Sequence, residues 1–149
     1  MKSLSQSTVA GGKNVAVYRI IYGDTDQMGV AYYANYLRWF ELGRSELLRS
    51  IGLPYGKIEA QGFHFPVTEV TCRYAQSARY DDLIEIETEI SSMRRATFTC
   101  NYKIRRSTDG AELACGFTKH ACVDRNGRIV RLPEILLEAL RAAGPKTGS

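Results

Sequence analysis

The sequence has no long hydrophobic run, and this absence argues against a membrane-spanning helix. The longest apolar-rich stretch, positions 29–40, is interrupted by Asn35 and Arg38, whereas crossing a bilayer takes roughly 20 apolar residues. The segment at 1–14 also lacks the apolar core of a secretion signal. We therefore expect no membrane span and a cytoplasmic location.

The chain also lacks blocks of like charge and paired cysteine motifs. The net charge is only +4, without a long Lys/Arg block, so we expect no nucleic-acid partner. The four cysteines, Cys72, Cys100, Cys115 and Cys122, form no Cys-x-x-Cys pair, which predicts reduced thiols and no metal site. His64 and His120 are isolated in the sequence and are interpreted as structural.

What is present fits one compact domain. The chain has 149 residues and a hydrophobic content of 44%, both ordinary for a globular protein. We predict a disordered N-terminal tail at 1–14, a single folded domain at 15–142 and a flexible C-terminal tail at 143–149.

Hydrophobic periodicity gives the order of the elements. Segment 83–93 alternates, with Ile84 and Ile86 on one face and Glu85 and Glu87 on the other, which is typical of a half-buried strand. Segment 33–51 predicts a long helix from apolar residues at steps of three and four: Tyr36, Leu37, Phe40, Gly43, Leu47, Leu48 and Ile51. Further strands are expected at 15–22, 65–74, 96–106 and 111–123, with a short helix at 132–142.

These elements predict an α+β fold with two layers. The buried face of an antiparallel sheet needs a cover, and only the helix expected at 33–51 is long and apolar enough to provide it. We therefore expect about five curved antiparallel strands wrapped around one long central helix.

Two carboxylates, Asp24 and Asp26, followed by Gly29, lie just before this helix. A helix start leaves backbone N–H groups unpaired and partly positive, so it can stabilise a carbonyl oxygen that becomes an oxyanion. A carboxylate opposite can attack that carbonyl or activate a water, and Gly29 lets the backbone approach a ligand. Taken alone, the same residues are also typical of a turn and a helix cap.

The pattern Asp24-Thr-Asp26-Gln-Met-Gly29-Val-Ala-Tyr-Tyr33-Ala-Asn-Tyr36, followed by an amphipathic helix, resembles the hotdog-fold acyl-CoA thioesterases of the 4-hydroxybenzoyl-CoA thioesterase family. The similarity covers about positions 15–135. It implies a hotdog fold and thioester hydrolysis of an acyl-CoA substrate, with no metal and no bound cofactor. It assigns Asp26 as the catalytic carboxylate and the backbone N–H of Tyr33 as the group that polarises the thioester carbonyl, which leaves Asp24 as a turn or capping residue.

The resemblance also implies substrate contacts. Arg94 and Arg95 are expected to hold the phosphates of CoA, although Ala96 stands where the benzoyl-CoA enzyme has a third basic residue. Glu41 matches a position that faces the acyl group in that enzyme, and a surface helix glutamate is the alternative interpretation. By their apolar character, four residues are candidates for shaping an acyl slot: Met28, Val30, Tyr32 and Phe65.

Other functions are compatible with the sequence. A non-catalytic acyl-CoA-binding module is one, and a hotdog hydratase or dehydratase is another, although the latter chemistry needs a histidine near the helix start. Whether Asp26 acts as nucleophile or general base is open, as is the acyl group. The resemblance implies a homodimer with sheets joined edge to edge, often doubled to a homotetramer, and such pairing protects exposed strand edges.

Overall fold

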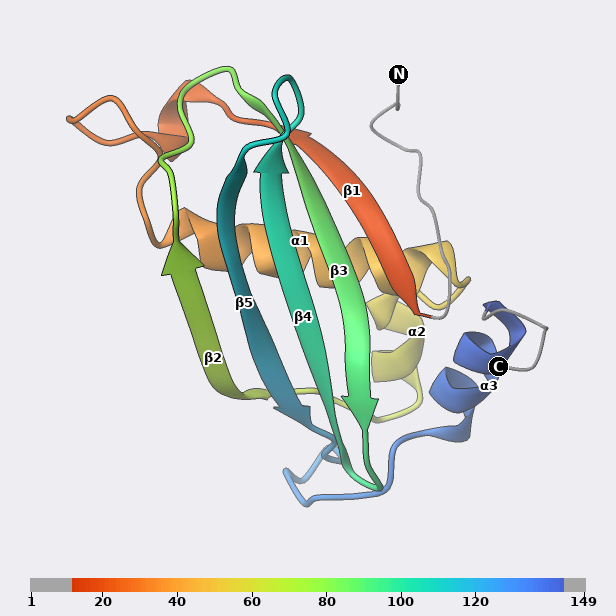
Figure 1. Cartoon of the computed structure of the whole chain (residues 1–149). Helices are drawn as coiled ribbons and strands as arrows, with labels where there is room; N and C mark the ends of the chain where they lie inside the picture. The colour runs from red at the N-terminus through yellow and green to blue at the C-terminus, as the bar shows by residue number, and fades with distance from the viewer. Residues whose placement is uncertain (1–11, 144–149) are drawn as a thin grey trace.

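The computed structural model describes residues 12–143, which form a five-stranded sheet and three α-helices (Figure 1). The strands are β1 (Lys13–Arg19), β2 (Val67–Tyr74), β3 (Leu83–Met93), β4 (Thr97–Arg106) and β5 (Glu112–Ala121). The helices are α1 (Asn35–Ser50), α2 (Tyr55–Ala60) and α3 (Glu134–Ala143), and a 3-10 turn, η1, covers Tyr22–Asp24. Within 12–143, no helix combines the length and the apolar character that a membrane crossing requires.

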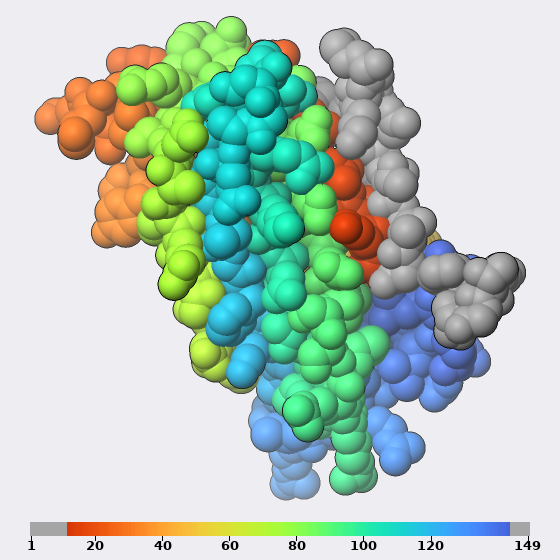
Figure 2. Space-filling model, viewed as in Figure 1, coloured from red at the N-terminus to blue at the C-terminus, as the bar shows by residue number. Residues whose placement is uncertain are grey.

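The sheet is antiparallel throughout, in the order β1-β3-β4-β5-β2, and its strands are curved (Figure 1). On β3, Ile84 and Ile86 are fully buried. Glu85 and Glu87 are half-buried on the other face, where both pair with Arg105. Figure 2 shows that the strands themselves form the surface on this polar face. The prediction of about five antiparallel strands with one buried face is confirmed.

Helix α1 lies across the apolar face of the sheet (Figure 1). Its buried residues are Asn35, Tyr36, Trp39, Phe40, Gly43, Leu47 and Leu48. Gly43 packs directly against the sheet, since an added Cβ would lie 2.7 Å from Ile86 Cγ2 and closer still to Thr88 Oγ1. Leu37, expected on the apolar face, is instead 40% exposed, while Trp39 is 3% exposed.

Element boundaries differ from the prediction where the sequence pattern is short or polar. Helix α2 follows Pro54 and was not expected, because six residues carry too little periodicity. The tail predicted at 1–14 overlaps β1, since Lys13 pairs with Glu89 and Asn14 with Thr88, and the polar Lys13–Asn14 pair hid the start of the strand. Residues 1–11 and 144–149 of the two predicted tails lie outside the described residues.

Candidate active site

The loop from Asp26 to Val30 is a tight β-hairpin. The Asp26 N–H donates to the Val30 carbonyl at 2.9 Å, and the Gly29 N–H donates to the Asp26 carbonyl at 3.0 Å. Gly29 has a φ of 80°, in the left-handed region that glycine adopts without strain and that this type of turn requires. The glycine therefore shapes the turn that presents Asp26, and its contact with a ligand stays a prediction.

Asp24 has a structural role, and only 3% of its surface is exposed. Its Oδ2 accepts hydrogen bonds from the Tyr18 hydroxyl at 2.7 Å and from the Ile21 N–H at 3.0 Å. Its carbonyl oxygen accepts from the Tyr32 N–H and from the Asn35 side-chain amide, both at 2.8 Å. Burial, followed by the Asp24 carboxylate, raises the pKa of Tyr18 to about 12, so the hydroxyl stays a donor. Asp24 thus ties β1, the loop and the start of α1 together.

Asp26, in contrast, is exposed. Its Oδ1 accepts a hydrogen bond from the Met28 N–H at 2.8 Å, an arrangement by which aspartate often stabilises its own turn. Its Oδ2 has no hydrogen-bond donor among residues 12–143. The turn therefore holds a carboxylate with one oxygen that no donor in the described part of the chain occupies.

The start of α1 offers unpaired backbone N–H groups. The Asn35 N–H donates to the Tyr32 carbonyl at 2.9 Å, but the N–H groups of Tyr33 and Ala34 meet no acceptor within the described part of the chain. The Tyr74 hydroxyl of β2 donates to the Tyr33 carbonyl at 3.1 Å and anchors this peptide. Helix α1 begins two residues later than predicted, so Tyr33 lies in the turn that leads into it. Free N–H groups at a helix start favour a developing negative charge.

A segment before β3, residues 77–82, braces both the loop and the helix start. The Ala31 N–H donates to the Ala78 carbonyl at 2.8 Å, and the Ala78 N–H donates to the Tyr36 hydroxyl at 3.0 Å. Val30 forms an antiparallel bridge with Arg79. The Asp26 turn and the Tyr33 N–H therefore share one support.

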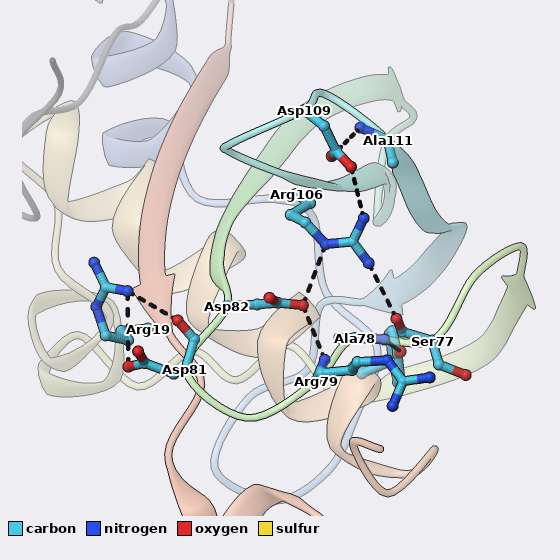
Figure 3. A network of polar contacts seen from close by, with 10 residues as sticks. Arg19, Ser77, Ala78, Arg79, Asp81, Asp82, Arg106, Asp109 and Ala111 are labelled. Atoms are coloured by element: carbon cyan, nitrogen blue, oxygen red, sulfur yellow. Dashed lines mark hydrogen bonds and ion pairs between the residues drawn. The ribbon is translucent and has the colours of Figure 1, made fainter. Parts of the chain in front are cut away.

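Arg106 of β4 holds this segment in place (Figure 3). Its guanidinium donates to Asp82 Oδ2 at 3.2 Å, to Asp109 Oδ2 at 2.9 Å and to the Ser77 carbonyl at 3.3 Å. The Arg79 N–H donates to the same Asp82 oxygen at 2.9 Å. The bond to Asp82 is the main cause that raises the pKa of Arg106, so the cation persists at every physiological pH.

Arg79 is a site candidate to which sequence reasoning gave no role. The Asp26 N–H donates to the Val30 carbonyl, and Val30 forms an antiparallel bridge with Arg79 on its other side. The three residues therefore lie opposite one another on three neighbouring extended segments, and their side chains point to the same face. Two strand spacings place the backbones of Asp26 and Arg79 roughly 10 Å apart. Among the described residues, the Arg79 guanidinium makes no hydrogen bond or ion pair. Only the bridge to Val30 reveals this position, and a bridge cannot be found from sequence spacing.

Glu41 and Phe65 come together at one hollow. It has a volume of about 160 Å³ and is lined by Glu41, Arg44, Ser45, Leu48, Tyr55 and Phe65. Glu41 is exposed, whereas Phe65 is buried. Glu41 lies eight residues beyond Tyr33, which at the rise of a helix corresponds to roughly 12 Å. Sequence reasoning missed Arg44, Ser45 and Tyr55 as lining residues.

Arg94 and Arg95 lie far from Asp26 within the chain. Both are exposed in the turn between β3 and β4, where the Arg94 N–H donates to the Thr97 carbonyl at 2.8 Å. The loop with Asp26 is at the other end of β3 (Figure 1), a strand of 11 residues that spans roughly 35 Å. One chain therefore does not bring the predicted carboxylate and the predicted phosphate contacts together.

No group of three His, Cys, Asp or Glu side chains in residues 12–143 has an arrangement that could hold a metal ion. Burial raises the pKa of the Cys100 thiol to about 11, so this cysteine stays protonated and is a poor nucleophile.

Comparison with known proteins gives consistent matches. A family model described as the thioesterase-like superfamily matches residues 22–140. The chain is 37% identical over 107 residues to the acyl-CoA thioesterase YbgC of Haemophilus influenzae, covering 71% of this chain and 77% of that protein. It is 30% identical over 98 residues to the 4-hydroxybenzoyl-CoA thioesterase of a Pseudomonas species, covering 64% and 70%.

Solved structures agree with the sequence matches. The structure of a DHNA-CoA thioesterase from Staphylococcus aureus superposes with a TM-score of 0.82 at 27% identity, covering 87% of this chain and 89% of that one. A protein from Aquifex aeolicus, described only as hypothetical, superposes with a TM-score of 0.80 at 34% identity, covering 85% and 98%.

Proposed function

Because the chain belongs to the thioesterase-like superfamily, we propose that it hydrolyses the thioester bond of an acyl-CoA to a free acid and CoA, with Asp26 as the catalytic carboxylate. The observation that carries the proposal is the shared support of two groups. Among the described residues, one Asp26 oxygen has no donor and the Tyr33 N–H has no acceptor, and both groups belong to one loop that Asp24 and the 77–82 segment brace.

The proposed chemistry needs little beyond these two groups. The Tyr33 N–H donates to the thioester oxygen and stabilises the negative charge that develops there. The Asp26 carboxylate either attacks the carbonyl carbon, to form an anhydride that water then cleaves, or removes a proton from the attacking water. In both routes water supplies the hydroxyl of the acid, and the sulfur leaves as the thiol of CoA. No metal and no bound cofactor takes part.

A second copy of the chain completes the site in this proposal. Strand β2 is an edge of the sheet, and nearly all its residues are exposed, including Val67 and Val70. Other large hydrophobic residues are exposed in segment 21–37, which contains the Asp26 loop, and at the two ends of segment 74–80: Ile21, Tyr22, Met28, Tyr32, Tyr33, Leu37, Tyr74 and Tyr80. A two-fold dimer that pairs two β2 edges would protect both the edges and this apolar surface.

Edge pairing also accounts for the separated substrate contacts. Two β2 strands paired antiparallel point in opposite directions, so the β3–β4 end of one sheet lies beside the Asp26 end of the other. We infer that Arg94 and Arg95 of one copy hold the CoA phosphates while Asp26 of the other acts on the thioester. The hollow with Glu41 and Phe65 is the proposed place for the acyl group.

The direct test is thiol release from a panel of aryl- and acyl-CoA thioesters by the wild type and by Asp26→Asn. The substitution keeps the shape and removes the charge, so we expect a folded variant with kcat at least about 100-fold lower. Equal rates, or no release from any thioester, would contradict the proposal. CoA thioester binding without release would instead identify a binding module, and hydration of an enoyl-CoA would identify a hydratase.

A further inference from the structure

A chain of hydrogen bonds runs through the core behind the hollow beside α1. The Arg44 Nη1 donates to the Tyr102 hydroxyl at 3.0 Å, and that hydroxyl lies 2.7 Å from Thr118 Oγ1. Thr118 Oγ1 lies 2.8 Å from His120 Nε2, and His120 Nδ1 lies 3.0 Å from the Phe65 carbonyl oxygen. The chain thus links α1, β4, β5 and the segment before β2.

The chemistry of the groups fixes the direction of every bond. The Phe65 carbonyl only accepts, so His120 Nδ1 carries a proton. Burial lowers the pKa of His120 to about 4, so the ring is neutral at pH 7 and its Nε2 accepts. Thr118 therefore donates to His120 and accepts from the Tyr102 hydroxyl, whose oxygen accepts from Arg44.

Stacked aromatic rings keep this chain rigid. The Tyr102 ring lies 4.2 Å from the Phe40 ring at an interplanar angle of 6°, and the His120 ring lies 4.7 Å from the Phe98 ring at 9°. Tyr102, Thr118 and His120 are all buried. A buried polar network whose donors and acceptors are all paired holds one arrangement.

Both ends of this hydrogen-bond chain lie at the same hollow. Arg44, the first donor, and Phe65, the last acceptor, line it together with Glu41. The backbone of Phe65 is held at its N–H as well, which donates to the Tyr55 hydroxyl at 3.1 Å. The network therefore fixes the wall that contains Phe65 relative to the wall formed by α1.

We propose that Tyr102, Thr118 and His120 are positioning residues that set the width of this hollow and thereby select the acyl groups that the enzyme accepts. The three side chains are buried, so they act on the acyl group only through Arg44 and Phe65. The proposal rests on the proposed function, in which the hollow receives the acyl group.

Thr118→Val breaks the network at its centre, because valine keeps the shape but neither donates nor accepts. Thr88→Val is a matched control: Thr88 is also fully buried in the sheet, but its hydroxyl has no partner among the described residues. Thr118→Ser keeps the hydroxyl and serves as the conservative variant. The readout is kcat/KM for thiol release from CoA thioesters that range from acetyl to octanoyl and benzoyl.

We expect Thr118→Val to reduce the ratio of kcat/KM between the best and the poorest thioester about tenfold. Thr118→Ser and Thr88→Val should keep that ratio within about twofold of the wild type. A uniform loss on all thioesters by Thr118→Val, with an unchanged ratio, would overturn the proposal. An equal change in Thr88→Val would do the same, since it would reveal a general effect of core substitutions.

A second readout does not depend on catalysis. Hydrogen exchange of the Phe65 amide should become at least about tenfold faster in Thr118→Val, at equal global stability, and remain unchanged in Thr88→Val. Unchanged Phe65 protection in Thr118→Val would overturn the positioning role even if the enzyme is active. If the wild type releases no thiol at all, the proposed function fails, whereas faster exchange would still support the network as the element that holds the Phe65 wall.

Discussion

At the residue scale, Asp24 and Asp26 are two positions apart but have opposite environments. Asp24 is buried and accepts from Tyr18 and Ile21, whereas Asp26 is exposed and accepts only from Met28 among the described residues. Spacing alone does not separate them, because the partners of Asp24 are set by how β1 and α1 meet. Only the family resemblance assigned the catalytic role to Asp26. The structure adds a physical reason against Asp24, because its buried carboxylate already accepts two hydrogen bonds.

This difference predicts unequal effects on stability of the same substitution at the two positions. Asp24→Asn leaves the Tyr18 hydroxyl and the Ile21 N–H a neutral amide oxygen in place of a charged carboxylate. Because hydrogen bonds to a charged acceptor are stronger, we expect the free energy of unfolding to fall by about 2 kcal/mol. Asp26→Asn keeps an oxygen for the Met28 N–H at an exposed site, so the expected change is within about 0.5 kcal/mol. Urea unfolding of both variants measures this, and an equal loss of stability would show that Asp26 is also structural.

At the element scale, the contact between α1 and β3 depends on the missing side chain of Gly43. Replacement of a glycine within a helix by alanine normally raises the free energy of unfolding by about 1 kcal/mol. At Gly43 the added Cβ would clash with Ile86 and Thr88, and overpacking costs about 1–3 kcal/mol. The second effect is larger, because the obstructing atoms belong to the side chains of two fully buried β-branched residues, which have little freedom to move aside.

We therefore expect Gly43→Ala to destabilise the protein by about 1–2 kcal/mol. Gly56 in α2 is a matched control, since a Cβ there meets nothing within 4 Å, and Gly56→Ala should be neutral or stabilise by up to about 1 kcal/mol. Thermal or urea unfolding decides the question. Stabilisation by both substitutions would show that α1 does not pack closely against β3 at Gly43.

The sequence predicts an element when a local pattern defines it, and fails when contacts between distant residues define it. The alternation along β3 is local, and so is the three-and-four spacing of α1, so both elements were predicted. Helix α2 is a single short element, and its packing against the rest of the chain determines it. The hollow joins Glu41 to Phe65, and the row of Asp26, Val30 and Arg79 joins two loops, so both depend on long-range register that no local pattern contains.

At the scale of the whole molecule, the two ends of the sheet carry different parts of the proposed site. The Asp26 loop is at one end, and the turn with Arg94 and Arg95 is at the other, roughly 35 Å away along β3. In a monomer, this distance would keep the carboxylate and the arginine pair from acting on one substrate molecule. It becomes favourable if two copies pair along β2, because each dimer then has two composite sites.

Composite sites predict complementation between two defective chains. Asp26→Asn and the double variant Arg94→Ala/Arg95→Ala should each form dimers with low kcat/KM at subsaturating acyl-CoA. Co-expressed with different affinity tags and purified as the mixed dimer, they should recover about half of the wild-type kcat/KM. The reason is that the mixed dimer contains one site with both an intact aspartate and an intact arginine pair, and one site with neither. A purified mixed dimer without recovered activity would show that each chain uses its own arginines or none, and the edge-to-edge arrangement would then lose its functional argument.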